Sequence, residues 1–85
     1  MITKTLCVHN EEGLHARPAK DFSKLASSFS SCVTIEKDDM SFNAKSMLMV
    51  LSACVCCNDT FVLKTEGEDE LAAMNALSEF IETLK

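Results

Sequence analysis

The chain has 85 residues, of which 47% are hydrophobic and 25% are charged, and its formal net charge is −5 at pH 7. This length suits one folded domain with a modest core, so we expect residues 1–85 to form a single domain. The negative net charge argues against a nucleic-acid-binding protein, because it offers no basic surface to a phosphate backbone. No apolar run approaches the ~20 residues that span a bilayer, and the N-terminus has no secretory pattern, which together predict a cytoplasmic protein without direct membrane insertion.

The cysteines raise the question of disulfides or metal binding. There are five of them, an odd count, and without a signal peptide this predicts free thiols in a reducing compartment. Cys54, Cys56 and Cys57 are close in sequence, so a thiol-based metal or redox module is an alternative. They lack the paired Cys-x-x-Cys spacing of a zinc site and have no obvious fourth ligand. We therefore expect buried small hydrophobes or unpaired loop thiols, and neither a metal nor an organic cofactor.

The first element is predicted to be a strand over residues 2–8. Ile2, Leu6 and Val8 can face a core while the residues between them face the other way. The polar stretch 9–13 follows as a turn, in which His9 is expected to be solvated.

Residues 13–19 place an imidazole, a guanidinium and a helix start close together. Gly13 permits a sharp turn after the strand, and Pro18 is tolerated only in the first turn of a helix. His15 is therefore predicted at or just before a helix N-terminus, where unpaired N–H groups and the helix dipole favour a phosphate. Arg17 adds a charged donor, and neutral imidazole is a competent nucleophile. The pattern favours a histidine that accepts and releases a phosphoryl group, with a surface or capping histidine as the alternative.

Residues 16–28 predict an amphipathic helix. Its apolar side is formed by Ala19, Phe22, Ala26 and Phe29, and its polar side by Lys20, Ser23, Lys24 and Ser27. Alternating residues then predict a hairpin of strands at 33–35 and 40–44, joined by a tight turn at Asp38-Asp39. Aspartate tolerates positive φ less well than glycine, which leaves the turn type open.

Ser46 is predicted to cap a short helix over residues 47–52, because its hydroxyl can accept a backbone N–H two or three residues on. Capping alone would explain this serine. A phosphoryl group there would add about −1.5 to −2 charge at a helix N-terminus, which tolerates it. The helix is apolar all round, so some of its side chains must be exposed.

Residues 60–66 predict the last strand, with Phe61, Leu63 and Thr65 on one face. A turn at 67–70 then leads into a helix that ends near Leu84. Its expected apolar stripe consists of Leu71, Met74, Leu77, Ile81 and Leu84. The predicted fold is α+β, an open-faced β-sandwich in which three helices cover one side of a four-stranded antiparallel sheet, in the order βαββαβα.

The segment Gly13-Leu14-His15-Ala16-Arg17-Pro18-Ala19 closely resembles the active-site motif of the HPr family, the histidine-containing phosphocarrier proteins of the bacterial phosphoenolpyruvate:sugar phosphotransferase system. Lys45-Ser46 also resembles the site where this family carries its regulatory serine. The resemblance implies a carrier rather than an enzyme. His15 would accept a phosphoryl group from phosphorylated enzyme I, at Nδ1, and pass it to the IIA component of a sugar permease. Arg17 and the backbone N–H groups of Ala16 and Arg17 would hold that group.

The resemblance also implies a docking surface formed by the first two helices. Its expected residues are Lys20, Lys24, Ser27, Met47, Leu48 and Leu51. Further implied partners are an HPr kinase/phosphorylase acting on Ser46 and a transcription regulator. We expect the protein to act as a monomer.

Some residues depart from the family pattern. At Lys20, Asp21 and Ser23 the better-known members mostly carry small or apolar residues, and many have glycine at the positions of Met49, Cys54 and Asn58. These changes leave the motif around His15 intact but affect the expected docking surface. The alternative function is therefore an HPr-like regulatory paralogue that binds a transcription factor or a metabolic enzyme.

Overall fold

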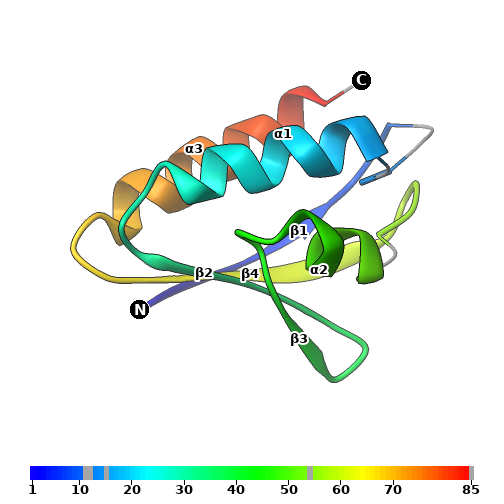
Figure 1. Cartoon of the computed structure of the whole chain (residues 1–85). Coiled ribbons are helices and arrows are strands. Elements are labelled where there is room, and N and C mark those ends of the chain that lie inside the picture. The colour runs from blue at the N-terminus through cyan, green and yellow to red at the C-terminus, as the bar shows by residue number, and fades with distance from the viewer. Residues whose placement is uncertain (11–12, 15, 54, 85) are drawn as a thin grey trace.

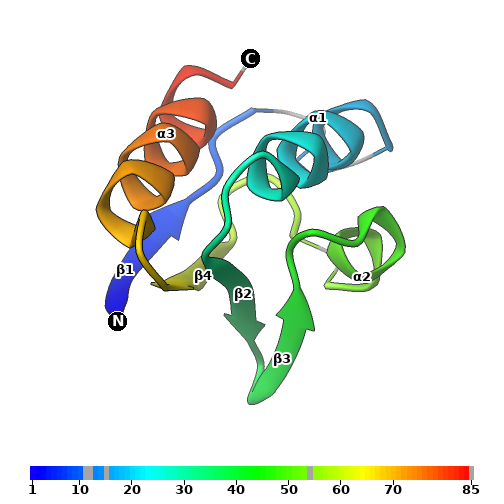
Figure 2. The ribbon, with the colours of Figure 1, turned by 60° about the vertical axis from the view of Figure 1, so that its left-hand side comes forward.

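The computed structural model describes residues 1–10, 13–14, 16–53 and 55–84, which form a sheet with helices packed on one face (Figure 1). The elements are β1 (Ile2–Cys7), α1 (Ala16–Ser27), β2 (Cys32–Lys37), β3 (Met40–Asn43), α2 (Met47–Ser52), β4 (Thr60–Glu66) and α3 (Glu70–Thr83). The strands pair antiparallel in the order β1-β4-β2-β3. The predicted open-faced α+β sandwich is thus confirmed, and Figure 2 shows its two layers.

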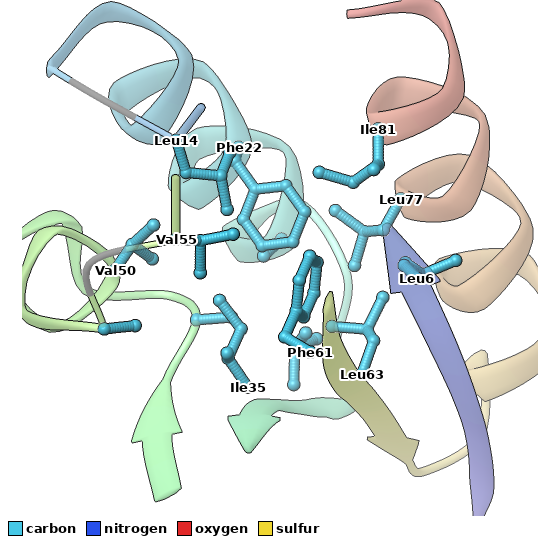
Figure 3. Packing of buried hydrophobic residues seen from close by; sticks show 14 of the residues in the cluster. Leu6, Leu14, Phe22, Ile35, Val50, Val55, Phe61, Leu63, Leu77 and Ile81 are labelled. Carbon is cyan, nitrogen blue, oxygen red and sulfur yellow. The ribbon is translucent and has the colours of Figure 1, made fainter. Parts of the chain in front are cut away.

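The core lies between the sheet and the helices, and the alternation of the strands creates it. In β4, Phe61 and Leu63 are buried and Thr65 is fully enclosed, as predicted. Phe22 of α1 packs above Phe61 and Leu63, opposite Leu77 and Ile81 of α3 (Figure 3). Its ring lies 5.7 Å from that of Phe80, tilted by 57°. Each such buried side chain stabilises the fold by about 1.5–3 kcal/mol, so this cluster fixes where α1 can sit.

The prediction that Ser23 lies on the exposed side of α1 was wrong. Ser23 is buried, and its hydroxyl donates to the carbonyl of Lys20 at 3.0 Å. Residues three and four apart share a helix face, so Ser23 adjoins the buried Ala19 and Ala26. The hydroxyl can leave water because its own helix backbone satisfies it.

Leu71 was also wrongly predicted, because it is 63% exposed rather than part of the apolar stripe of α3. A helix turns by about 100° per residue, which places Leu71 roughly a quarter turn or more away from Leu77 and Ile81. Ala73 and Ser78 are buried on the packed side instead.

The β2–β3 turn, left open by the sequence, places two aspartates in the left-handed region. Asp38 has φ 53° and Asp39 has φ 65°, as a type I′ hairpin turn requires. The ammonium of Lys37 lies 3.5 Å from carboxylate oxygens of both Asp38 and Asp59. Partial burial opposes the charged form, but these two carboxylates together outweigh it and raise the pKa of Lys37. The hairpin is thereby joined to the loop before β4.

Of the helices within the described residues, none combines the length and the apolar character that crossing a lipid bilayer requires.

Asp69 joins the start of α3 to the turn between α1 and β2. Its carboxylate accepts hydrogen bonds from the backbone N–H groups of Ser30 and Ser31, each at 2.9 Å, and from both hydroxyls. The hydroxyl of Ser31, followed by the backbone N–H of Ser30, lowers the pKa of Asp69 to about 2. The charged form is therefore favoured in the folded chain.

We expect Asp69→Asn to lower the thermal unfolding temperature at neutral pH, because an amide offers one acceptor oxygen instead of two. Because folding lowers the pKa of Asp69 from its ordinary value of 3.8, the ionised carboxylate stabilises the folded state at pH values above 3.8. That stabilisation is lost as the pH falls through about 2. The difference in Tm between wild type and variant should therefore narrow between pH 4 and pH 2. Calorimetry across this range measures it, with Glu68→Gln, an exposed neighbour, as the control. A difference that stays constant with pH would contradict the role of the carboxylate.

Candidate functional site

The predicted phosphoryl site lies where the chain passes from β1 into α1. Gly13, Leu14 and the residues from Ala16 onward are described there, whereas His15 lies outside the described residues. The geometry of the site is therefore built from the neighbours of His15.

Gly13 makes the turn before α1, and both its conformation and its surroundings require glycine. Its φ is +64°, which L side chains rarely adopt. A Cβ atom there would lie 2.7 Å from Cys56 Cα and closer still to the carbonyl oxygen of Val55. The next residue, Leu14, is buried and donates its backbone N–H to that same carbonyl at 2.8 Å. The turn is thus pressed directly against the backbone of residues 55–56.

The loop before β4 also holds the segment that leads from β1 into this turn. Val8 donates its N–H to the carbonyl of Asp59 at 3.0 Å and accepts the N–H of Asn58 at 2.6 Å. Asn58 has φ +68°, so asparagine occupies a left-handed position, which among non-glycine residues asparagine tolerates best. The carboxylate of Asp59 accepts the backbone N–H of Cys56 at 2.9 Å, which is the main cause that lowers the pKa of Asp59.

Asn10 closes the turn from within, although it is not among the predicted site residues. Its side-chain amide donates to the carbonyl of Gly13 at 3.0 Å, and its own carbonyl accepts the N–H of Gly13 at 3.2 Å. Asn10 is buried. The available signal was the pairing of asparagine and glycine three residues apart, which is typical of a β-turn.

Helix α1 begins at Ala16, so Pro18 occupies its first turn as predicted. Ala16 and Arg17 are exposed, and the first turn carries no acidic residue. Within the described ranges, no ion pair or hydrogen bond engages the guanidinium of Arg17. Backbone N–H groups at a helix start, next to an exposed guanidinium, form an arrangement suited to a phosphate.

The predicted docking residues lie on two helices that are fixed to each other. The hydroxyl of Ser27, at the end of α1, donates to the carbonyl of Lys45 at 3.3 Å. The ammonium of Lys45 in turn donates to the carbonyl of Phe29 at 2.8 Å, just beyond that helix end. Figure 2 shows α1 and α2 side by side.

Exposure differs among these residues. Lys20, Lys24 and Ser27 are exposed on α1. On α2, Leu48 is 76% exposed and Met47 37%, whereas Leu51 packs partly against the core. Ser46 caps α2 as predicted, because its hydroxyl accepts the N–H of Met49 at 3.4 Å.

Cys7, Cys32 and Cys57 are free thiols, and Cys54 lies outside the described residues. Cys7 Sγ lies 4.0 Å from Nδ1 of His9, and Cys57 Sγ lies 3.8 Å from the backbone oxygen of His9. In the part of the chain that is described, no three His, Cys, Asp or Glu side chains are grouped to bind a metal ion. A hollow of about 330 Å³ lies away from this region, on the helix-free face of the sheet beside Glu36 and Lys64.

Comparison with known proteins identifies close relatives. The family model described as PTS HPr component phosphorylation site matches residues 2–83. The HPr-like protein Crh of Halalkalibacterium halodurans is 44% identical over 82 residues, which cover 96% of this chain and 98% of that protein. The phosphocarrier protein HPr of Treponema pallidum is 39% identical over 77 residues, covering 91% and 88%. The crystal structure of HPr from Thermoanaerobacter tengcongensis superposes with a TM-score of 0.95 at 42% identity, covering 98% and 93%.

We expect Gly13→Ala to destabilise the fold by about 1–3 kcal/mol, because a side chain is forced into the left-handed region and against the backbone of Val55 and Cys56. Urea unfolding measures the change. Asn58→Gly is the matched control, since it removes a side chain from a similar positive φ and should stay within about 1 kcal/mol of wild type. Equal stability of wild type and Gly13→Ala would show that the two loops can separate at no cost.

Proposed function

This chain belongs to the HPr family of phosphocarrier proteins, and on that premise we propose that it accepts a phosphoryl group from phosphorylated enzyme I on His15 and passes it to the IIA component of a sugar permease. The intact motif of residues 13–19 at the start of α1 carries this proposal. The exposed guanidinium of Arg17, which has no ion pair or hydrogen bond within the described residues, lies beside that helix start and supports the proposal.

In the proposed reaction, a ring nitrogen of neutral His15 attacks phosphorus. The new N–P bond forms while the bond from phosphorus to the donor breaks, and transfer to the acceptor reverses these roles. The family resemblance assigns the nitrogen as Nδ1. Arg17 and the backbone N–H groups of Ala16 and Arg17 would stabilise the charge on the phosphoryl oxygens. A site with few donors suits a carrier, because tighter binding would retain the group.

We place the docking surface for these partners on α1 and α2, next to the site. It combines the cationic Lys20 and Lys24 with the exposed Met47 and Leu48. An apolar centre with charged residues at its rim is a common anatomy for protein interfaces. The departure at Ser23 does not alter this surface, because Ser23 is buried.

The second candidate is a regulatory function exercised through Ser46. It is favoured by the 44% identity to a relative named an HPr-like protein rather than a phosphocarrier. Ser46 lies at the start of α2, directly before the exposed Met47 and Leu48, so a phosphoryl group there would meet any partner that covers them. Its partners would be an HPr kinase/phosphorylase and a transcription regulator or metabolic enzyme.

Incubation with enzyme I and radiolabelled phosphoenolpyruvate distinguishes the two candidates. We expect wild type to gain an acid-labile, base-stable label, His15→Ala to gain none, and Arg17→Ala to be labelled more slowly with its Tm nearly unchanged. Circular dichroism checks that each variant is folded. Labelling of His15→Ala would exclude His15 as the acceptor, and an unlabelled wild type would favour the regulatory candidate.

We expect Ser46→Asp to raise the KM for phosphorylation by enzyme I several-fold, because docking would have to desolvate a charge beside Met47 and Leu48. Lys20 can partly offset that charge, so the penalty should be larger in the Lys20→Ala background. Steady-state kinetics of wild type, the two single variants and the double variant measure the coupling between Lys20 and Ser46. Equal penalties in both backgrounds would show that Lys20 does not act on Ser46, and no penalty in either would remove Ser46 from the docking surface.

A further inference from the structure

We propose that Asn10 is a positioning residue for phosphoryl transfer, which holds the backbone that leads into His15. This inference rests on the proposed function, and the experiment below separates the two. Asn10 has no place in the transfer chemistry itself, because it is buried beneath the turn.

The peptide unit between Gly13 and Leu14 is held at both of its polar groups. Its carbonyl, that of Gly13, accepts the side-chain amide of Asn10 at 3.0 Å. Its N–H, that of Leu14, donates to the carbonyl of Val55 at 2.8 Å. Two bonds on opposite edges of one peptide plane fix its rotation about the chain. This matters at Gly13 because glycine restricts its own φ and ψ less than any other residue.

Of these two hydrogen bonds, only the one from Asn10 is made by a side chain. Its own carbonyl also accepts the N–H of Gly13 at 3.2 Å, so the turn from 10 to 13 is closed by the backbone as well. The backbone bond shapes the turn, and the side-chain bond orients the peptide that leaves it. Helix α1 begins three residues after Gly13, at Ala16. An error in the orientation of this peptide would therefore be carried directly into the phosphate-binding helix start.

The side chain of Asn10 leaves one buried polar atom without a hydrogen-bond partner among the described residues, which opposes folding. It is 6% exposed, and among the described residues its Oδ1 atom has no hydrogen-bond partner. An unpaired buried acceptor opposes folding, so a residue chosen for stability alone would not need to leave one. The amide nitrogen is the half of the side chain that bonds, and it bonds to Gly13. The buried amide is thus explained by where its N–H points.

The first measurement is the rate at which enzyme I and phosphoenolpyruvate phosphorylate the full chain. We expect Asn10→Ala to lower kcat on the order of tenfold, because small misplacements of reacting groups are costly. KM should change little, since a buried residue does not touch the partner. Ile81→Val is the matched control, because it weakens the core from α3 and should leave kcat unchanged at temperatures where both variants are folded.

The second measurement uses Asn10→Asp, which keeps the shape of the side chain. An ionised carboxylate cannot donate to the carbonyl of Gly13, whereas a protonated one can, and burial favours protonation. The rate of this variant relative to wild type should therefore rise as the pH falls from 8 to 5, while the ratio for Asn10→Ala stays flat. The other titratable groups on these loops are common to variant and wild type, so their effects cancel in the ratio. They are Cys7, His9, Glu11, Glu12, His15, Cys54, Cys56, Cys57 and Asp59.

The outcomes are distinct. A labelled wild type with unchanged kcat in Asn10→Ala, a change confined to KM, or a ratio for Asn10→Asp that does not vary with pH would each overturn the role of Asn10 and leave the proposed function standing. A wild type that enzyme I does not label would overturn the proposed function, and the positioning role with it.

Discussion

The close approach of two loops is the constraint on which the site depends. β1 and β4 are antiparallel neighbours, with Cys7 paired to Thr60, so the chain leaving β1 emerges beside the chain entering β4. There the backbone of Gly13 lies against that of Val55 and Cys56, with no room for a side chain. The pairing of β1 with β4 therefore determines where α1 begins.

One side of α1 packs into the core, and the other side carries exposed residues of the site. Phe22 anchors one side of α1 among the buried residues, while Arg17 and the lysines remain exposed on the other. Lys45 also fixes α2 relative to α1, because it makes hydrogen bonds with residues at and just beyond the end of α1. A rigid pair of helices offers a partner one surface rather than two independent ones, which lowers the entropy lost on binding.

Periodicity predicted the elements well but not the margins of their buried faces. The alternation in β4 and the cap at Ser46 are local patterns, and both were confirmed. Ser23 and Leu71 were misplaced because each lies at the border of an apolar stripe, where burial depends on what packs there. A hydroxyl that bonds its own helix can be buried, and a leucine on the side of a helix that faces away from the core remains exposed.

The sequence by itself determined the order of elements, the turn at Gly13, the helix start before Pro18 and the resemblance to the HPr family, because each rests on residues close together in the chain. The tertiary structure decided which polar groups hold these elements in place. Asp69 bonds to Ser30 and Ser31, about half the chain away, and Leu14 bonds to Val55. Such contacts leave no local pattern, since their partners meet only when the sheet and helices have packed.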